Sequence, residues 1–189
     1  RCWSAGGRLV LDNVRSAYNV GSIFRTADAA RLAEVITCGF TPHPPHPKLH
    51  KTAFASIDHV KTRHFESTHA ALAAMREEGV PVFAMETTQR SRSYVSVAFP
   101  PKGVALVLGN EEVGVDTTVL DLVDGLIEIP CLGFKNSLNV ASACSAVAFE
   151  VLRQWGVFGP SPEPRGALDA EPLRPETREE PYQSQLRDA

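Results

Sequence analysis

Short apolar runs recur along the first 130 residues, with amphipathic stretches between them. Runs rich in apolar residues occupy 8–11, 34–38, 81–85, 104–108 and 126–129. The run at 104–108 (Val-Ala-Leu-Val-Leu) is apolar on both faces, which is typical of a strand buried in a parallel sheet. Residues 60–65 alternate only weakly, so we expect an edge strand there.

Stretches with helical periodicity lie at 23–32, 67–78, 116–123 and 137–155. We expect Ser67 to cap the second of these and Gly79 to end it, with Ala70, Leu72, Ala73 and Met75 on its apolar face. The last helix is predicted to begin at Ser137 and to bury Val140, Cys144, Val147, Ala148 and Val151. Strands that alternate with helices predict an α/β fold, with a mostly parallel sheet covered by helices on both faces.

Composition divides the chain into a domain at 1–159 and a tail at 160–189. The 189 residues are 43% hydrophobic and carry a net charge of −3. The last thirty residues hold six prolines and seven acids against four arginines, which predicts a disordered, acidic tail. The rest is then neutral, so a polyanion would have to bind a local basic patch.

The four cysteines are far apart and form no C-x-x-C pair, which predicts a reduced, cytoplasmic protein with Cys38 and Cys144 in the core. The sequence has no run of 18 apolar residues and no signal peptide, so we expect no membrane association. Because the first residue is Arg1 and not Met, the sequence leaves open whether an extension or targeting segment precedes it.

Residues 129–142 (Ile-Pro-Cys-Leu-Gly-Phe-Lys-Asn-Ser-Leu-Asn-Val-Ala-Ser) join the last apolar run to the last helix. Pro130 cannot continue a strand, and a loop of small and polar residues follows it. A strand end next to a helix start exposes unpaired backbone groups, which suits an anionic or nucleotide-like ligand. An ordinary strand-to-helix connection accounts for this stretch equally well.

Three segments together resemble the motifs of the SpoU-type (TrmH-like) RNA ribose 2′-O-methyltransferases of the SPOUT superfamily. They are Asn19-Val-Gly-Ser-Ile-Phe-Arg25-Thr-Ala-Asp28, Leu108-Gly-Asn-Glu-Glu-Val-Gly114, and Ile129-Pro130 with Ser137-Leu-Asn-Val140. Each alone is a weak signal, since glycine-rich turns after strands are common. All three occur in the family's order and spacing, over about residues 8–155.

The resemblance implies a specific fold, cofactor and assembly. The family fold ends in a deep trefoil knot, an exception to the rule that chains do not knot. The family binds S-adenosylmethionine against the knot loops and is dimeric, with each active site shared between subunits. By position, the cofactor contacts would be Gly109, Ile129 and Leu138, with Glu86 and Thr87 added from the end of the preceding strand. The catalytic set would be Asn19, Arg25, Glu111, Ser137 and Asn139.

Methyl transfer to a 2′-OH needs a poor nucleophile held in line with a sulfonium methyl. Asn19 and Arg25 are six residues apart near the start of a helix, and we expect both to reach one pocket. Deprotonating a guanidinium at pH 7 costs at least about 7 kcal/mol, so we favour Arg25 as a cation that binds phosphate and stabilises the oxyanion, not as a base. Alone, Arg25 would more simply pair with Asp28 or Glu34.

Other site residues have simpler alternatives. Glu111 could orient Arg25 or accept hydrogen bonds from loop amides, but beside Glu112 it could also be part of a solvated acidic turn. Asn139 could only cap the last helix. Lys135 could be an ordinary surface lysine or a phosphate contact.

The one local concentration of basic residues includes the Pro-rich loop after the second strand. We assign RNA backbone contacts to Lys48, Lys51, Arg63, Arg90 and Lys135. The same loop carries His43, His46 and His50, but the prolines between them break the spacing that would direct the rings toward one metal ion, so no metal is expected.

The leading hypothesis is thus an S-adenosylmethionine-dependent RNA 2′-O-methyltransferase, acting on tRNA more readily than on rRNA, as a homodimer. A catalytically silent RNA- or cofactor-binding module of the same fold is the alternative. A dehydrogenase or P-loop enzyme is disfavoured, because the first strand lacks G-x-G-x-x-G after it and Gly109–Gly114 lacks the Lys-Ser/Thr of a P-loop.

Overall fold

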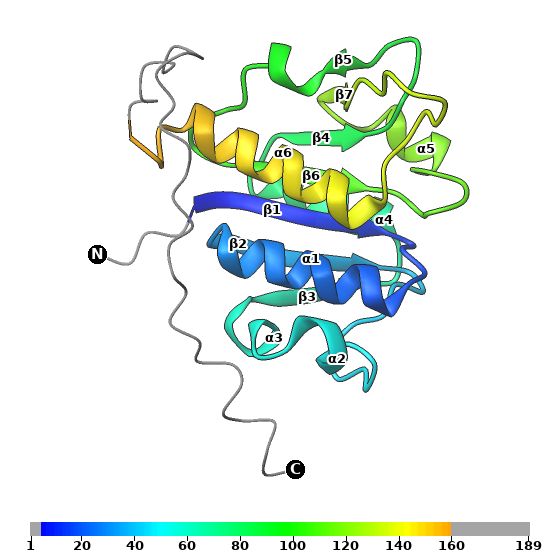
Figure 1. Cartoon of the computed structure of the whole chain (residues 1–189), viewed down its shortest axis with the longest axis vertical. Coiled ribbons are helices and arrows are strands. Elements are labelled where there is room, and N and C mark those ends of the chain that lie inside the picture. Colours follow the sequence, from blue (N-terminus) through cyan, green and yellow to red (C-terminus); the bar gives the residue numbers. More distant parts are fainter. Residues whose placement is uncertain (1–4, 160–189) are drawn as a thin grey trace, which may run out of the picture. The chain divides into compact units, whose positions relative to one another are not determined.

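The computed structural model describes residues 5–159, which form a seven-stranded sheet with helices on both faces (Figure 1). Every strand pair is parallel, and the strand order is β3-β2-β1-β6-β4-β7-β5. The strands are β1 (Ala5–Asp12), β2 (Leu32–Cys38), β3 (Thr62–Phe65), β4 (Val82–Met85), β5 (Arg92–Ser93), β6 (Val104–Leu108) and β7 (Gly125–Glu128). The α/β fold with a parallel sheet is therefore confirmed.

The helices are α1 (Ala17–Ala29), α2 (His50–Ala53), α3 (Ser56–His59), α4 (Thr68–Glu77), α5 (Thr117–Leu120), α6 (Val140–Gln154) and a 3-10 turn, η1 (Tyr94–Ser96). In Figure 1, α1 and α6 lie side by side on one face of the sheet, and α4 covers the other. None of the helices within residues 5–159 is long and apolar enough to cross a bilayer. The predicted tail lies outside the described residues.

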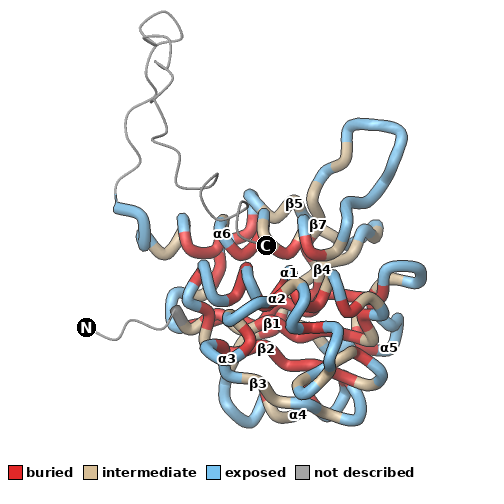
Figure 2. The backbone as a smooth tube through the Cα atoms, turned by 60° about the horizontal axis from the view of Figure 1, so that its bottom comes forward, coloured by how far each residue is buried: buried red, intermediate tan, exposed pale blue. Residues whose placement is uncertain are grey.

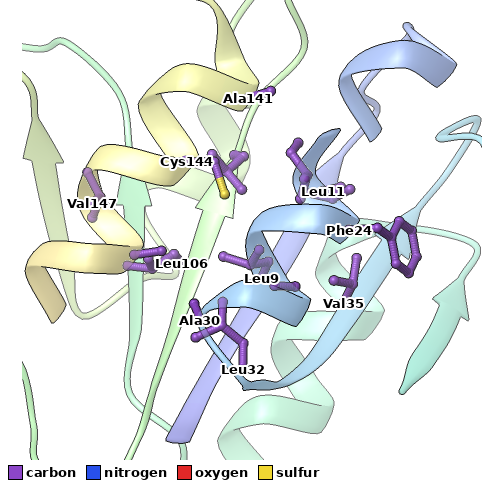
Figure 3. Packing of buried hydrophobic residues seen from close by; sticks show 14 of the residues in the cluster. Leu9, Leu11, Phe24, Ala30, Leu32, Val35, Leu106, Ala141, Cys144 and Val147 are labelled. Carbon is purple, nitrogen blue, oxygen red and sulfur yellow. The ribbon is translucent and has the colours of Figure 1, made fainter. Parts of the chain in front are cut away.

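Successive side chains of the central strands point to opposite faces of the sheet, so each face has a hydrophobic core of its own. Leu9, Leu11 and Leu106 point to the face under α1 and α6, where they pack with Phe24, Cys144 and Val147 (Figure 3). Val10, Ala105 and Val107 point to the opposite face, where they pack with α4. Figure 2 shows that the buried residues run along these strands while the connecting loops are exposed. The strand at 104–108 is buried at every position, as predicted.

Cys38 and Cys144 both lie in the core, as predicted. Burial raises the pKa of each thiol to about 12, so neither is a reactive thiolate.

The helix caps follow the sequence in two cases. The Ser67 hydroxyl accepts from the Ala70 N–H (3.2 Å), and Gly79 ends the helix at a φ of +66°. The apolar face of α4 was predicted in part: Leu72 and Met75 are buried as expected, but Ala70 and Ala73 are exposed, and Thr68 and Ala71 are buried in their place. Asp116 caps α5, which ends at Leu120, three residues before the predicted stretch ends.

Two helix starts differ from the prediction. The first helix starts at Ala17, six residues early, because the Ser16 hydroxyl accepts from the Asn19 N–H (3.3 Å). The last helix starts at Val140, not at Ser137, because the Asn139 side chain takes its first free N–H groups. The short elements α2, α3 and β5 had no counterpart in the predicted set.

Candidate active site

The carboxyl ends of β4, β6 and β7 open into a cleft of about 550 Å³. In a parallel sheet all the strand ends meet at one edge, so the loops that follow them converge. The lining comes from the ends of these strands, from residues 109–114, from the segment between β7 and α6 and from the first turn of α6: Met85, Glu86, Thr87, Leu108, Gly109, Asn110, Glu111, Glu112, Val113, Gly114, Ile127, Glu128, Ile129, Cys131, Asn136, Ser137, Leu138, Asn139, Val140 and Ala143.

Asn110 closes the loop after β6 on itself. Its backbone exchanges two hydrogen bonds with Gly114 (3.0 and 2.9 Å), and its side-chain oxygen accepts from the N–H groups of Glu112 and Val113. Its amide nitrogen donates to the Asn13 carbonyl (2.8 Å) and so joins this loop to the one after β1. The loop therefore has a fixed shape before any ligand binds.

Glu86 joins the loop after β4 to the loop after β6. Its carboxylate accepts from the Val115 N–H (2.8 Å) and from the Thr87 N–H (3.0 Å). Gly114 faces this carboxylate at a φ of +74°, and a Cβ there would collide with it. Glycine is therefore required at 114 both by backbone conformation and by space.

Glu111 reaches from the cleft to the start of α1. Its carboxylate accepts from the N–H groups of Arg15 (2.8 Å) and Ser16 (3.0 Å) and from the Asn19 amide (2.8 Å). Burial by itself would raise the pKa of Glu111, but these donors outweigh it and lower the pKa. The carboxylate is thus charged at neutral pH, and it accepts from loop amides, one of the two roles expected for it.

The side-chain orientations of Asn19 and Asn139 follow from Glu111. A carboxylate only accepts, so the Asn19 nitrogen faces it and the Asn19 oxygen is left to accept from the Asn139 nitrogen (3.0 Å). The Asn139 oxygen then accepts from the N–H groups of Ala141 and Ser142, which can only donate. One chain of hydrogen bonds, with a single direction, therefore links all three motifs. Asn139 does cap α6, and it also holds Asn19.

Arg25 does not reach this pocket within one chain. Six residues on a helix turn through about 600°, which places Arg25 about 120° around α1 from Asn19. Its guanidinium carbon lies 5.4 Å from the centre of the Phe54 ring, beyond α2. Neither simple ion pair forms, because Asp28 accepts from Ser56, and Glu34 pairs with Arg8, Lys61 and Arg63.

The other predicted site residues divide into three groups. All five predicted cofactor positions line the cleft, namely Glu86, Thr87, Gly109, Ile129 and Leu138. Of the predicted catalytic residues, Glu111, Ser137 and Asn139 line it, and Asn19 is joined to it through hydrogen bonds. Lys48, Lys51 and Lys135 are exposed on loops or short helices, and Arg90 is exposed but pairs with Asp121 (3.0 Å).

Arg63 is the exception among the predicted RNA contacts. Its guanidinium donates two bonds to Glu34 (2.6 and 2.7 Å) and one to Glu78 (2.7 Å). Charge-assisted bonds of this kind commit the group to its partners, and the carboxylates raise the Arg63 pKa. We therefore withdraw Arg63 from the RNA-binding set.

Some features gave no signal in the sequence. Leu132 and Phe134, between β7 and α6, are almost fully exposed (99% and 100%) beside the cleft. His43 stacks on His64 with ring centres 3.8 Å apart. Among residues 5–159 no group of three or more His, Cys, Asp or Glu is placed to hold a metal ion.

The cleft fits a nucleoside that carries a positive charge. Its size falls in the range of small-molecule sites. Met85, Ile129 and Leu138 offer apolar surface for a base, and four glutamates (Glu86, Glu111, Glu112 and Glu128) supply negative charge. The described lining contains no lysine or arginine. This combination suits the adenosyl sulfonium cation of S-adenosylmethionine better than a nucleotide phosphate.

Proteins with a parallel α/β sheet bind their ligands at the carboxyl ends of the strands. The acidic cleft at this edge therefore defines a protein that binds a small-molecule cofactor. The sequence profile of the SpoU rRNA Methylase family matches residues 7–149, which is more than half of the chain. The chain therefore belongs to the SpoU (TrmH) family of RNA 2′-O-methyltransferases, and the resemblance seen in the sequence is confirmed.

Individual relatives agree with this assignment. The chain is 33% identical over 163 residues to a tRNA (guanosine(18)-2′-O)-methyltransferase of Thermus thermophilus, covering 86% of this chain and 81% of that one. It is 31% identical over 146 residues to the 23S rRNA (guanosine-2′-O-)-methyltransferase RlmB of Vibrio cholerae, covering 77% and 58%. A crystal structure of an AdoMet-bound rRNA methyltransferase from Sinorhizobium meliloti superposes with a TM-score of 0.74 at 30% identity, covering 80% and 57%.

Proposed function

We propose that this chain is an enzyme that transfers the methyl group of S-adenosylmethionine to a ribose 2′-OH in structured RNA, with tRNA preferred over rRNA. The observation that supports this most directly is one cleft that the second and third motifs and all five predicted cofactor positions line, and to which Asn19 of the first motif is joined by hydrogen bonds with Glu111 and Asn139. The preference for tRNA rests on the Thermus thermophilus tRNA enzyme, which matches this chain over most of both lengths. A cytoplasmic location is part of the same proposal.

The residues Glu86, Thr87, Gly109, Ile129 and Leu138 would hold the cofactor. S-adenosylmethionine supplies an electrophilic methyl group: the ribose 2′-oxygen forms a bond to that carbon as the carbon–sulfur bond breaks. Because Glu86 and Asn110 already fix the surrounding loops, binding requires little reordering of the protein. Leu132 and Phe134 lie outside the lining and would remain available to other contacts.

Asn19, Ser137 and Asn139 would orient the ribose, with Glu111 holding Asn19 in place. The Asn19 amide has a fixed direction, so it offers the same polar edge to every substrate. Arg25 would bind the adjacent phosphate and stabilise negative charge on the 2′-oxygen, and the proton would leave to phosphate or water. The guanidinium stays charged throughout, which avoids the high cost of deprotonating it.

A homodimer would bring Arg25 to the reaction. Within one chain Arg25 points away from Asn19, so a shared site needs the Arg25 of a second copy. Mixing inactive Asn19→Ala and Arg25→Ala proteins should then restore activity, because a mixed dimer has one intact site. Failure to restore activity, together with a monomer in sedimentation at micromolar concentration, would reject the shared site.

A deep trefoil knot is proposed for the C-terminal part. After β7, the chain crosses to α6, and the segment at 97–100 packs across the end of that helix. Gln154 donates to the Val97 carbonyl (3.0 Å) and accepts from the Phe99 N–H (3.0 Å), and the Trp155 indole donates to the Pro100 carbonyl (3.1 Å). Contacts of this kind support a helix threaded beneath a loop.

The decisive test uses purified protein, S-adenosylmethionine labelled in the methyl group, and tRNA and rRNA transcripts as separate substrates. Digestion to nucleosides and mass spectrometry should find label on a ribose 2′-oxygen, in tRNA more than in rRNA. The Asn19→Ala variant is the matched control and should incorporate little. Cofactor binding without methyl transfer would favour the silent binding module, and label on a base would overturn the proposed reaction.

A further inference from the structure

The side of α1 that faces away from the cleft forms a second set of contacts. Gly21, Arg25 and Asp28 follow one another along this face at helical spacing and meet the corner between α2 and α3. A Cβ at Gly21 would collide with Thr52, Arg25 lies over Phe54, and Asp28 accepts from the Ser56 hydroxyl (2.9 Å). Arg25 is therefore flanked by two fixed contacts along the helix.

Phe54 is an unusual residue for its position. It ends α2 with φ +50° and ψ −141°, a backbone conformation that bulky residues rarely adopt and that glycine adopts easily. The residue is also 62% exposed, so it contributes little to the core. Neither stability nor packing explains a phenylalanine here, but its contact with Arg25 does.

We infer that Phe54 is a positioning residue that orients the guanidinium of Arg25 for methyl transfer. The face of an aromatic ring attracts a cation, and a flat guanidinium stacks on it. A long arginine side chain would otherwise sample many rotamers, and only some of them would point to the substrate phosphate. The inference rests on the proposed function, because the oriented group acts on the RNA.

The test compares Phe54→Leu, which removes the ring electrons but keeps an apolar side chain, with Phe54→Tyr, which keeps the ring. Phe54→Leu should lower kcat roughly two- to fivefold, in line with a cation–π contact at an exposed site, and leave the KM for S-adenosylmethionine unchanged. Phe54→Tyr should keep nearly the full rate. Phe54→Gly should lose activity while keeping or gaining thermal stability, because it relieves the backbone conformation. Phe40→Leu, at another exposed phenylalanine (63%), is the matched control and should change nothing.

Two further measurements separate positioning from a general structural effect. In an Arg25→Ala background, Phe54→Leu should add no further loss of kcat. The side-chain N–H resonance of Arg25 should lie upfield in the wild type, because of the ring above it, and should move back in Phe54→Leu. A normal kcat in Phe54→Leu, or an undiminished loss in the Arg25→Ala background, would overturn the inference. If the wild type transfers no methyl group, the proposed function fails, and an unshifted Arg25 resonance would then reject the Phe54 contact independently.

Discussion

Two glutamates of this protein, Glu34 and Glu111, each accept from several groups, but the donors are of different kinds. Glu34 on β2 is 2% exposed and is surrounded by side-chain cations: Arg8 on β1, Lys61, and Arg63 on β3. Glu111 at the cleft is bound by two backbone N–H groups and one asparagine amide. Glu34 joins strands through long charged side chains, whereas Glu111 joins loops through their backbone.

The difference follows from whether a ligand has to enter beside the carboxylate. Around Glu34 no ligand has to enter, so arginine can neutralise the charge directly. A fixed arginine in the cleft would repel a sulfonium cation, and backbone N–H groups stabilise the Glu111 carboxylate without adding a full positive charge. Glu34 is buried whereas Glu111 is exposed, so the two carboxylates differ in burial as well as in the groups that neutralise them: side-chain cations at the structural site and backbone N–H groups at the cleft.

The largest effect should come from Glu34→Ala. Removing one partner of a buried ion-pair group leaves unpaired charges, which costs about 3–5 kcal/mol of folding free energy. Urea unfolding should report this loss, while the S-adenosylmethionine affinity of the protein that stays folded should be unchanged. The exposed Glu66→Ala is the control. A loss no larger than that of the control would contradict the structural role of Glu34.

Glu111→Gln should have the opposite effect: the rate of methyl transfer should fall while stability changes little. A glutamine nitrogen in place of a carboxylate oxygen would face an N–H group and misorient Asn19, and such a displacement can lower kcat by about 10²-fold. Single-turnover methyl transfer should show this loss, with only a small shift in the unfolding midpoint. Glu66→Gln, at an exposed glutamate outside the cleft lining, serves as control. Equal rates in the two variants would remove Glu111 from the site.

The pH dependence of stability should show whether the charge of Glu111 is what the loop N–H groups bind. The pKa of Glu111 is lower in the folded protein than its ordinary value of 4.5. Its contribution to stability is therefore complete above pH 4.5 and is lost as the pH falls through the lowered pKa. The difference in unfolding temperature between wild type and Glu111→Gln should shrink on acidification from pH 6 toward pH 3. A difference that is constant over this range would show that the charge of Glu111 is not what the loops bind.

The smallest effect concerns RNA affinity. Because Arg63 is committed to Glu34 and Glu78, RNA contacts would depend on free cations such as Lys48 and Lys51. Replacing both lysines by glutamine should reduce the slope of log affinity against log salt by about 1–2. Arg153→Gln, which only loses a pair with Glu150, should leave the slope unchanged. An unaltered slope in the double variant would show that the RNA backbone contacts lie elsewhere on the protein.

The sequence predicted the long elements well, because they carry their own signals. The strand at 104–108 is apolar at every position, and Ser67 and Gly79 mark both ends of α4. The short elements were missed since α2, α3 and β5 have four residues or fewer and depend on tertiary contacts, such as Thr52 against Gly21. The start of α6 was misplaced because Ser137 and Asn139 are both good caps, and only the bond to Asn19 decides between them.

The candidate site was predicted as a set of residues but not as a geometry. Motif resemblance pointed to five cofactor positions, and all five line one cleft. It did not show that Arg25 and Asn19 point in different directions, because the predicted helix began at residue 23, after Asn19, whereas α1 starts at Ala17 and carries both residues. Arg63 resembled a surface cation, since nothing in its local sequence indicates that Glu34 lies on the adjacent strand.

The hydrogen bonds from Glu111 to Asn19 and from Asn19 to Asn139 span 92 and 120 positions of the chain. A nascent polypeptide released before its last helix would have a nearly complete sheet but no partner for the Asn19 oxygen. Competence for chemistry would then arise only after α6 has been synthesised and has packed against α1.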